Sequence, residues 1–161
     1  MVRVFVFYDS KYGNTKLAAE KIAEGMRTIG GVDAEVGYIK KVNVEQVVGY
    51  DAILLGAPNH MGRPSRSMKQ FINRLAALDL RAKNVAVFGT YSGRARSIDR
   101  SVKKLVKTVE EKLPNLRLLS HTLSVRVNGV KGPIMEGELP KCIDFGKKLL
   151  PQLSKPTDGR Q

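Results

Sequence analysis

The sequence predicts an α/β fold with three layers, in which a parallel β-sheet lies between two layers of helices. Short apolar segments that suit buried strands alternate five times with longer segments whose apolar residues recur at helical spacing. The apolar segments also show little alternation with polar residues, which is typical of strands buried on both faces. Because neighbouring parallel strands need crossover connections, this alternation of strands and helices indicates a parallel sheet.

Five segments are expected to form the strands of this sheet. The strongest are residues 2–8, 52–57 and 84–90, which are short, apolar and rich in β-branched or aromatic residues. Residues 33–39 and 116–127 show a weaker pattern, and the second of these is expected to be broken. The three strong segments are therefore predicted to form the buried centre of the sheet.

Helices are expected in the intervals after these strands, because apolar residues recur there with helical spacing. The residues that share a buried face are, helix by helix, Leu17, Ile22, Met26 and Ile29; Met68, Phe71, Ile72 and Leu75; Ile98, Val102, Leu105, Val106, Val109 and Leu113; and Leu139, Cys142, Ile143, Gly146, Leu149, Leu150 and Leu153. Residues 43–49 are expected to form a short helical turn.

Prolines and one glycine refine the helix boundaries. Pro64 suits the first turn of the second long helix, Pro114 ends the third, and Pro140 lies near the start of the last. Gly146 lies on the inner face of the last helix, where the missing side chain predicts close contact between helix and sheet.

The length of 161 residues suits one domain, which we expect at residues 1–153, followed by a polar tail at 154–161 that frays. No apolar run approaches the roughly 18 residues that a membrane span needs. The first residues lack the pattern of a secretory signal. A single cysteine, Cys142, cannot form an internal disulfide, which favours a reducing cytoplasm.

The charge is strongly positive and unevenly distributed. The chain has 28 Lys and Arg against 15 Asp and Glu, a net charge of +13. Residues 60–108 hold twelve of the bases and only two acids, Asp79 and Asp99, so they carry 12 − 2 = +10. Such a basic surface attracts phosphorylated cofactors, acidic proteins or nucleic acid. The alternative is a solvated face that serves solubility and ion pairing.

The loops to examine for a ligand are residues 9–15, 57–63 and 90–97. Each follows a predicted central strand, and open α/β sheets bind ligands beyond the carboxyl ends of their strands. Classical nucleotide motifs are absent from these loops, because neither Gly-x-x-x-x-Gly-Lys-Ser/Thr nor Gly-x-Gly-x-x-Gly occurs.

The first loop, "SKYGNT" at residues 10–15, has the features of an anion site. A helix N-terminus presents unpaired backbone N–H groups and a partial positive charge, which suit a phosphate. Ser10 and Thr15 add hydroxyl groups, and Gly13 permits a positive φ and a close approach of the backbone to a ligand. The alternative is an ordinary cap on a surface helix.

The same loop resembles the flavodoxin phosphate loop, Thr/Ser-x-Thr-Gly-x-Thr. Residues 54–75 ("LLGAPNHMGRPSRSMKQFINRL") and 85–95 ("VAVFGTYSGRA") are similar to the two flavodoxin strands that carry the flavin loops, and "LPKCIDFGKKL" is similar to the last helix. The resemblance spans residues 2–153 and is closest to the flavodoxin-like module of A-type flavoproteins, here as a stand-alone domain. It implies a flavodoxin-like sandwich with a five-stranded parallel sheet, in the order 2-1-3-4-5, and a bound FMN.

The resemblance also implies a set of FMN-binding residues. The residues expected around the phosphate are Ser10, Lys11, Tyr12, Gly13, Asn14 and Thr15. The residues expected along one side of the isoalloxazine ring of FMN are Ala57, Pro58, Asn59, His60, Met61 and Gly62. The residues expected along its other side are Thr90, Tyr91, Ser92, Gly93, Arg94 and Ala95. These two segments are called the ring loops. The chain has no Trp, so Tyr91 is the expected stacking residue, with His60 a weaker candidate.

No side chain is expected to act as a catalytic acid or base, because FMN supplies the redox chemistry. No metal site is expected either, since His60, His121 and Cys142 are far apart in sequence. Arginines in or just after the ring loops are expected to favour the reduced, anionic flavin and so to raise its potential. They are Arg63, Arg66, Arg94, Arg96 and Arg100.

The expected function is electron transport, or the activity of a small FMN-dependent oxidoreductase. The expected partner is an acidic redox protein or a small anionic electron donor. One alternative is a binding module that has lost FMN and uses its basic surface for nucleic acid or an acidic protein. A lower-ranked alternative is a flavodoxin-type protoporphyrinogen oxidase, for which the segment before the last helix is too short.

Overall fold

The computed structural model describes residues 2–60, 63–80, 83–92 and 100–153. Strands and helices alternate along it, with one short 3-10 helix, η1. In chain order the elements are β1 (Val2–Tyr8), α1 (Asn14–Arg27), β2 (Val32–Tyr38), η1 (Val44–Gly49), β3 (Ala52–His60), β4 (Arg63–Pro64), α2 (Arg66–Ala76), β5 (Asn84–Tyr91), α3 (Arg100–Lys112), β6 (Arg117–Arg126) and α4 (Glu138–Leu153).

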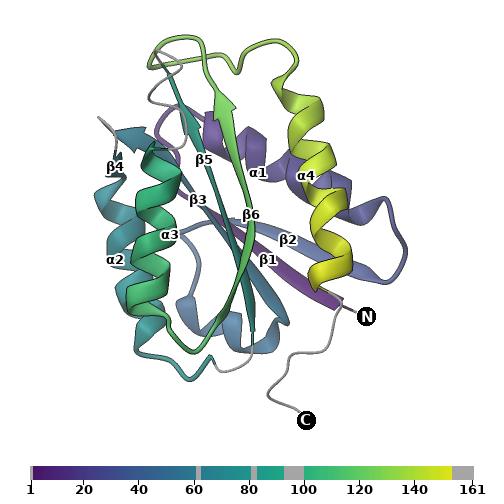
Figure 1. The fold of residues 1–161 in the computed structure, drawn as a ribbon, viewed down its shortest axis with the longest axis vertical. Helices are drawn as coiled ribbons and strands as arrows, with labels where there is room; N and C mark the ends of the chain where they lie inside the picture. Colours follow the sequence, from purple (N-terminus) through teal and green to yellow (C-terminus); the bar gives the residue numbers. More distant parts are fainter. Residues whose placement is uncertain (1, 61–62, 81–82, 93–99, 154–161) are drawn as a thin grey trace.

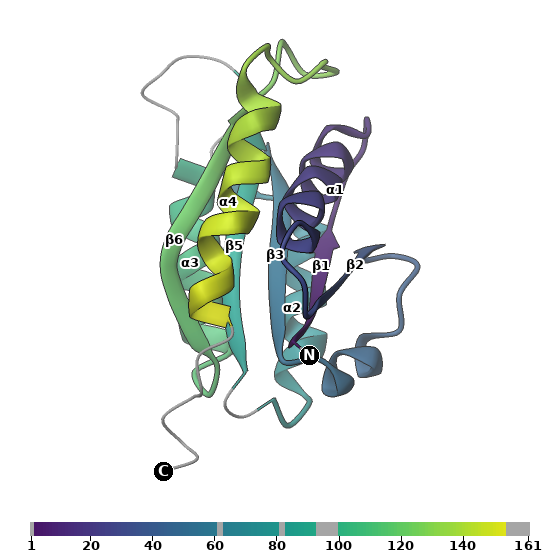
Figure 2. The same cartoon turned by 90° about the vertical axis from the view of Figure 1, so that its right-hand side faces the viewer.

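The sheet confirms the predicted fold class. Its strands run in the order β2-β1-β3-β5-β6, and every neighbouring pair on this path is parallel. This is the predicted order 2-1-3-4-5 with one addition, because the two-residue strand β4 pairs antiparallel with the end of β3. Helices α1 and α4 cover one face of the sheet, and α2 and α3 cover the other (Figures 1 and 2).

Two apolar clusters fill the spaces between the sheet and its helices. One joins α1 and α4 to the sheet, and the other joins α2 and α3 to the opposite face. The predicted inner face of α2 is confirmed, since its four apolar residues, Met68, Phe71, Ile72 and Leu75, are fully buried. Every residue of β5 is buried as well, as expected for a central strand. Among the described residues, no helix is both long and apolar enough to cross a lipid bilayer.

Strand β6 differs from the expected broken strand. It runs continuously over ten residues, but its register against β5 shifts, since Leu118 lies opposite Val85 and Thr122 lies opposite Val87. The irregularity that suggested a break is therefore an insertion within one strand. An edge strand tolerates such an insertion because only one of its sides is paired.

Two helix boundaries also differ from expectation. Pro64 lies in β4 rather than in the first turn of α2, and Ser65 caps that helix by accepting a hydrogen bond from the backbone N–H of Met68 at 3.3 Å. Ile29 was expected on the inner face of α1, but the helix ends at Arg27 and the Ile29 side chain is 50% exposed. The helical spacing of apolar residues in the sequence therefore extends beyond the C-terminal end of α1.

Gly146 packs against another helix rather than against the sheet. A Cβ atom on Gly146 would lie 2.1 Å from the carbonyl oxygen of Ile22 on α1. The contact is reciprocal, because a Cβ atom on Gly25 of α1 would lie 2.1 Å from the carbonyl oxygen of Ile143 on α4. The backbones of α1 and α4 therefore approach each other closely at two glycines. This contact fixes the position of α1 and, with it, the end of the loop that precedes α1.

Cys142 is fully buried on α4, as the sequence predicts for a small core residue. Burial, with a smaller contribution from Glu138, raises the pKa of its thiol from 9.0 to about 12. Because the thiolate is the reactive form, we expect iodoacetamide to modify the folded chain at neutral pH at least roughly 100-fold more slowly than the chain in urea. Equal rates in the two conditions would contradict this burial.

The same shift predicts an effect of alkaline pH. The stabilising contribution of the protonated thiol is complete below pH 9 and is lost as the pH rises toward the folded-state pKa of about 12, because the unfolded chain releases this proton first. The free energy of unfolding should therefore fall less steeply with pH in a Cys142→Ala variant than in the original chain.

Candidate functional site

The loop between β1 and α1 forms a bare helix N-terminus. Gly13 occupies the N-cap position with φ of 90°, and no side chain makes a capping hydrogen bond there. Instead, the hydroxyl oxygen of Ser10 accepts the backbone N–H of Gly13 at 2.9 Å, which closes the turn. The first turn of α1 contains no acidic residue. The N–H groups that begin this helix therefore have no side-chain cap and no acidic residue in their own turn, and such uncapped helix N-termini can bind phosphate groups.

A buried hydrogen bond connects this helix start to the end of β5. The hydroxyl oxygens of Thr15 and Thr90 are 2.9 Å apart, and the two residues are 1% and 4% exposed. Since Thr15 lies in the first turn of α1 and Thr90 near the carboxyl end of β5, the bond fixes the start of α1 relative to the end of β5.

We expect Thr90→Val to lower the free energy of unfolding by about 1 to 2 kcal/mol, because the isosteric valine leaves the Thr15 hydroxyl buried without this partner. Urea denaturation of the chain without added ligand measures the effect. The matched control is Thr108→Val, whose hydroxyl donates to the carbonyl oxygen of Lys104 on an exposed part of α3. A Thr90→Val variant as stable as the control variant would contradict the structural role of the pair.

A small cleft of about 90 Å³ lies above the carboxyl ends of the strands, where the sequence places the site. Three predicted loops meet there. The lining residues that were predicted are Ser10, Lys11, Tyr12, Asn14, Thr15, Pro58, Asn59, Thr90, Tyr91 and Ser92. The structure thus brings together residues that are far apart in the sequence, and it places the bare N-terminus of α1 at one end of the cleft.

Some predicted site residues do not line this cleft. Ala57 is 2% exposed and belongs to the cluster beneath α2 and α3, because β3 continues past it to His60. Gly13 borders a neighbouring groove instead, although it shapes the loop. The predicted residues Met61, Gly62, Gly93, Arg94 and Ala95 lie outside the described residues, as does the side chain of His60.

One wall of the cleft was not predicted. Val127, Gly129 and Val130, from the segment between β6 and α4, line it together with the predicted loops. Asn14 reaches this segment, since its side-chain amide donates a hydrogen bond to the carbonyl oxygen of Lys131 at 3.2 Å. The glycines around residues 129–132 signal turns in the sequence, but only the folded topology shows that these turns meet the start of α1.

The chemistry of the cleft favours binding over acid–base catalysis. Its described lining contains hydroxyl, amide, apolar and aromatic side chains and one lysine, Lys11, and it contains no carboxylate, histidine or thiol. Within the described part of the chain, no group of three or more His, Cys, Asp or Glu residues could hold a metal ion. Such a lining suits a ligand that brings its own reactive group.

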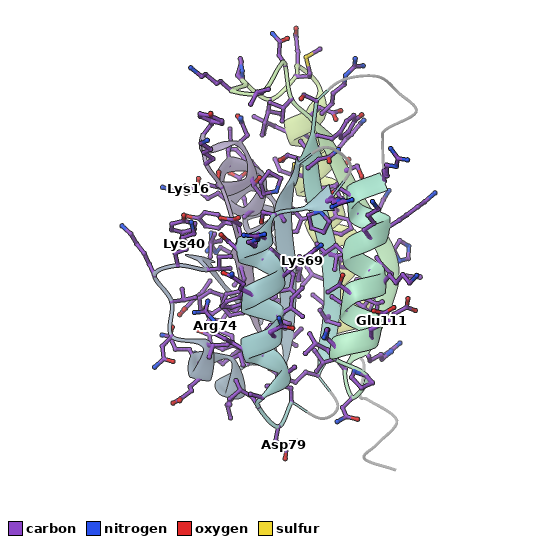
Figure 3. All side chains as sticks on the ribbon, turned by 90° about the vertical axis from the view of Figure 1, so that its left-hand side faces the viewer. Lys16, Lys40, Lys69, Arg74, Asp79 and Glu111 are labelled. Carbon is purple, nitrogen blue, oxygen red and sulfur yellow. The ribbon has the colours of Figure 1, made fainter. Side chains whose placement is uncertain are left out.

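Helices α2 and α3 each carry more bases than acids, and Lys69 and Arg74 are seen on α2 in Figure 3. Helix α2 carries three bases, including Lys69 and Arg74, and no acid. Helix α3 has four bases before its two acids, and the acids, Glu110 and Glu111, come in its last turn. Because α3 starts after the loop that follows β5, its basic half is the part nearer the cleft.

Comparison with known proteins agrees with the observed fold. The flavodoxin domain family matches residues 5–119. A flavodoxin of Aquifex aeolicus (strain VF5) is 37% identical over 73 residues, which are 45% of this chain and 40% of that protein. An NAD(P)H dehydrogenase (quinone) of Cupriavidus metallidurans is 33% identical over 115 residues, covering 59% of this chain and 58% of that protein. The match thus spans about half the length of these relatives.

Solved structures show the same fold. A flavodoxin from the domain Archaea superposes with a TM-score of 0.79 at 21% identity, covering 96% of this chain and all of that one. The flavodiiron core of Flv1 from Synechocystis superposes with a TM-score of 0.74 at 18% identity, covering 94% of this chain and 36% of that one. The second match agrees with the resemblance to a flavodoxin-like module of larger flavoproteins.

Proposed function

We propose that this chain, which belongs to the flavodoxin domain family, is a redox protein that transfers electrons through non-covalently bound FMN. FMN is the cofactor that membership of this family implies. The observation that carries the proposal is the position of the bare α1 N-terminus at one end of a cleft beyond the carboxyl ends of the strands. The fold, the chemistry of the loop and the family all support this position for the cofactor.

The residues present fit the phosphate end of FMN. Gly13 turns the backbone with a positive φ, so the amides that begin α1 remain available to an anion. Hydroxyl groups of Ser10 and Thr15 line the same cleft and add donors, and Lys11 adds a positive charge. A phosphate placed at this helix N-terminus is stabilised both by hydrogen bonds and by the helix dipole.

The remaining lining fits the flat, largely apolar ring. Pro58, Val127 and Val130 present apolar surface, while Tyr12 and Tyr91 present aromatic surface. Tyr91 is 9% exposed and its carbonyl oxygen accepts the backbone N–H of Val127 at 2.7 Å, so its backbone is held against the segment that follows β6. We propose Tyr91 as the residue that packs against the ring.

Bound FMN supplies the electron chemistry, and the chain supplies binding and electrostatics. The lining residues hold and orient the flavin, and none of the described ones is proposed as a catalytic acid or base. Arg63, Arg66 and Arg100 lie on the elements that follow the two ring loops and are exposed. Their charge favours the negative charge that a flavin gains on reduction, so we propose a higher midpoint potential than that of acidic flavodoxins.

For electron transfer, we propose a redox protein with an acidic surface as the partner. Arg66 begins α2 and four bases lie in the first part of α3, in the helix ends that follow the carboxyl ends of β3 and β5. These bases attract such a surface and orient it toward the flavin. A small anionic electron donor is the alternative partner, because the same charges would steer it to the cleft.

A small FMN-dependent reductase is the second candidate function. The observation that favours it is the similarity to an NAD(P)H dehydrogenase (quinone) over 115 residues. A reductase needs room for a substrate beside the flavin, whereas a carrier needs only an accessible ring edge. Steady-state oxidation of NADH or NADPH with a quinone acceptor distinguishes the two functions, since a carrier turns over only when a partner reductase is added.

The proposal is tested by purifying the chain and measuring its visible spectrum, the identity of the extracted flavin and the Kd for FMN. We expect yellow protein, or colourless protein that binds one FMN and quenches its fluorescence. Colourless protein that leaves the fluorescence of added FMN unchanged would sink the proposal. If such protein bound DNA with a steep salt dependence, the flavin-free binding module would replace it.

A further inference from the structure

We propose that the loop between β6 and α4, residues 127–137, covers the ring of FMN and contacts it through Val130. The inference rests on the proposed function, and it extends the site to a segment that the sequence did not indicate. Val127, Gly129 and Val130 of this loop line the same cleft as the phosphate-type loop. Figure 2 shows the loop reaching from the end of β6 over the sheet toward the start of α1.

The loop is held in place by its own backbone at its base. Val127 pairs with Ile134 in an isolated antiparallel bridge, and the backbone N–H of Asn128 donates to the carbonyl oxygen of Pro133 at 2.8 Å. Next to this bridge, the backbone N–H of Met135 donates to the carbonyl oxygen of Arg126 at 2.9 Å. These bonds fold residues 128–133 into a hairpin-like tip that carries Val130.

A second attachment joins the tip to the phosphate-type loop. The side chain of Asn14 donates to the carbonyl oxygen of Lys131, and Gly132 packs directly against the same side chain. A Cβ atom on Gly132 would lie 2.5 Å from Oδ1 of Asn14, and the φ of Gly132 is +93°, so glycine suits this position for two independent reasons. The tip and the start of α1 therefore form one rigid corner of the cleft.

Val130 occupies this rigid tip with its side chain in solvent. It is 75% exposed, more than any other large hydrophobic residue in the described part of the chain. A single exposed valine needs no explanation. Here, however, Tyr12 is also a large exposed side chain, at 43%, and lines the same cleft. Two exposed apolar groups on fixed loops at one cleft indicate an apolar ligand surface that covers them.

The chemistry of the neighbours decides which part of FMN Val130 meets. A bound phosphate would be held by amides, hydroxyl groups and Lys11 at the start of α1, whereas a valine side chain has no hydrogen-bond donor to offer an anion. The dimethylbenzene and pyrimidine rings of the flavin offer flat surface that valine can cover. We therefore assign Val130 to the ring rather than to the phosphate.

The experiment compares FMN and riboflavin binding by fluorescence quenching in the original chain, Val130→Ser and Val48→Ser. Val48 is a matched control, because it is 58% exposed but lies on η1, which precedes β3 at the opposite end of the sheet. Losing the apolar contact should raise the Kd of Val130→Ser by about five-fold for both flavins, since both carry the ring. Val48→Ser should match the original chain, and urea denaturation without flavin should give equal stability for all three.

Each outcome bears on the inference. Equal Kd values for Val130→Ser and the original chain would overturn it. A higher Kd of Val130→Ser for FMN with an unchanged Kd for riboflavin would also overturn it, because Val130 would then act near the phosphate. If the original chain bound neither flavin, the proposed function would fail first and this inference with it, which distinguishes the two failures.

Discussion

Replacing Ser10 with aspartate is expected to weaken FMN binding by about 100-fold, because a carboxylate beside the phosphate adds like-charge repulsion of roughly 1–4 kcal/mol at an intermediate dielectric. The Ser10 hydroxyl already accepts the N–H of Gly13, and an aspartate oxygen in the same place keeps this bond. The loop itself should therefore survive the change. Only the anion is expected to be excluded.

The expected stability of the variant runs in the opposite direction. A carboxylate next to the N-terminus of α1 interacts favourably with the helix dipole, since the first turn has no acidic residue of its own. The free energy of unfolding without flavin should rise by about 0.3 to 1 kcal/mol. Lower affinity together with higher stability is a combination that simple misfolding of the loop does not produce.

Titrations with FMN and riboflavin, followed by fluorescence quenching, measure the effect. Riboflavin lacks the phosphate, so its Kd should be unchanged in Ser10→Asp. The matched control is Ser10→Asn, which can also accept the Gly13 N–H but carries no charge, and its loss of FMN affinity should be much smaller. If Ser10→Asp bound FMN as tightly as Ser10→Asn, the phosphate would not lie at this helix N-terminus.

The central strands could be predicted from sequence because their burial leaves a direct trace. The ends of strands β1 and β5 were predicted to within one residue, because strands buried on both faces have continuous apolar sequences. Strand β6 could not be read in this way. Its middle residues, Ser120, His121 and Thr122, are exposed at the edge of the sheet, and there the register shift looks like a break.

The site divides along a similar line. Residues 10–15 could be proposed from sequence as a phosphate-binding loop because such a loop is local, and its glycine, its hydroxyl groups and the following helix all lie within a few positions. Val130 was missed because its loop meets the cleft through contacts between distant parts of the chain, such as the bond from Asn14 to Lys131, which joins positions 117 residues apart. No spacing rule contains that information. Ala57 was expected beside the ring but does not line the cleft, and the sequence did not show that β3 continues past it to His60.

The close approach of α1 and α4 supports the second large effect that we expect. Gly146→Ala should lower the free energy of unfolding by about 3 kcal/mol, because its Cβ atom would lie 2.1 Å from the carbonyl oxygen of Ile22 and 3.1 Å from the backbone N of Met26. Both contacts are with backbone atoms of α1, so no side chain can rotate away. The two helices must separate, or α4 must shift along α1.

Separation of these helices should also displace residues of the proposed flavin site, because Asn14 and Thr15 lie at the start of α1. We therefore expect the Kd of Gly146→Ala for FMN to rise as well, although residue 146 does not line the cleft. Urea denaturation gives the stability and fluorescence titration gives the Kd. Gly30→Ala is the matched control, since Gly30 has no atom within 4 Å of its Cβ position and no positive φ. The alanine at position 30 should be neutral or slightly stabilising. Equal stability of the two variants would show that the backbones of α1 and α4 do not meet at Gly146.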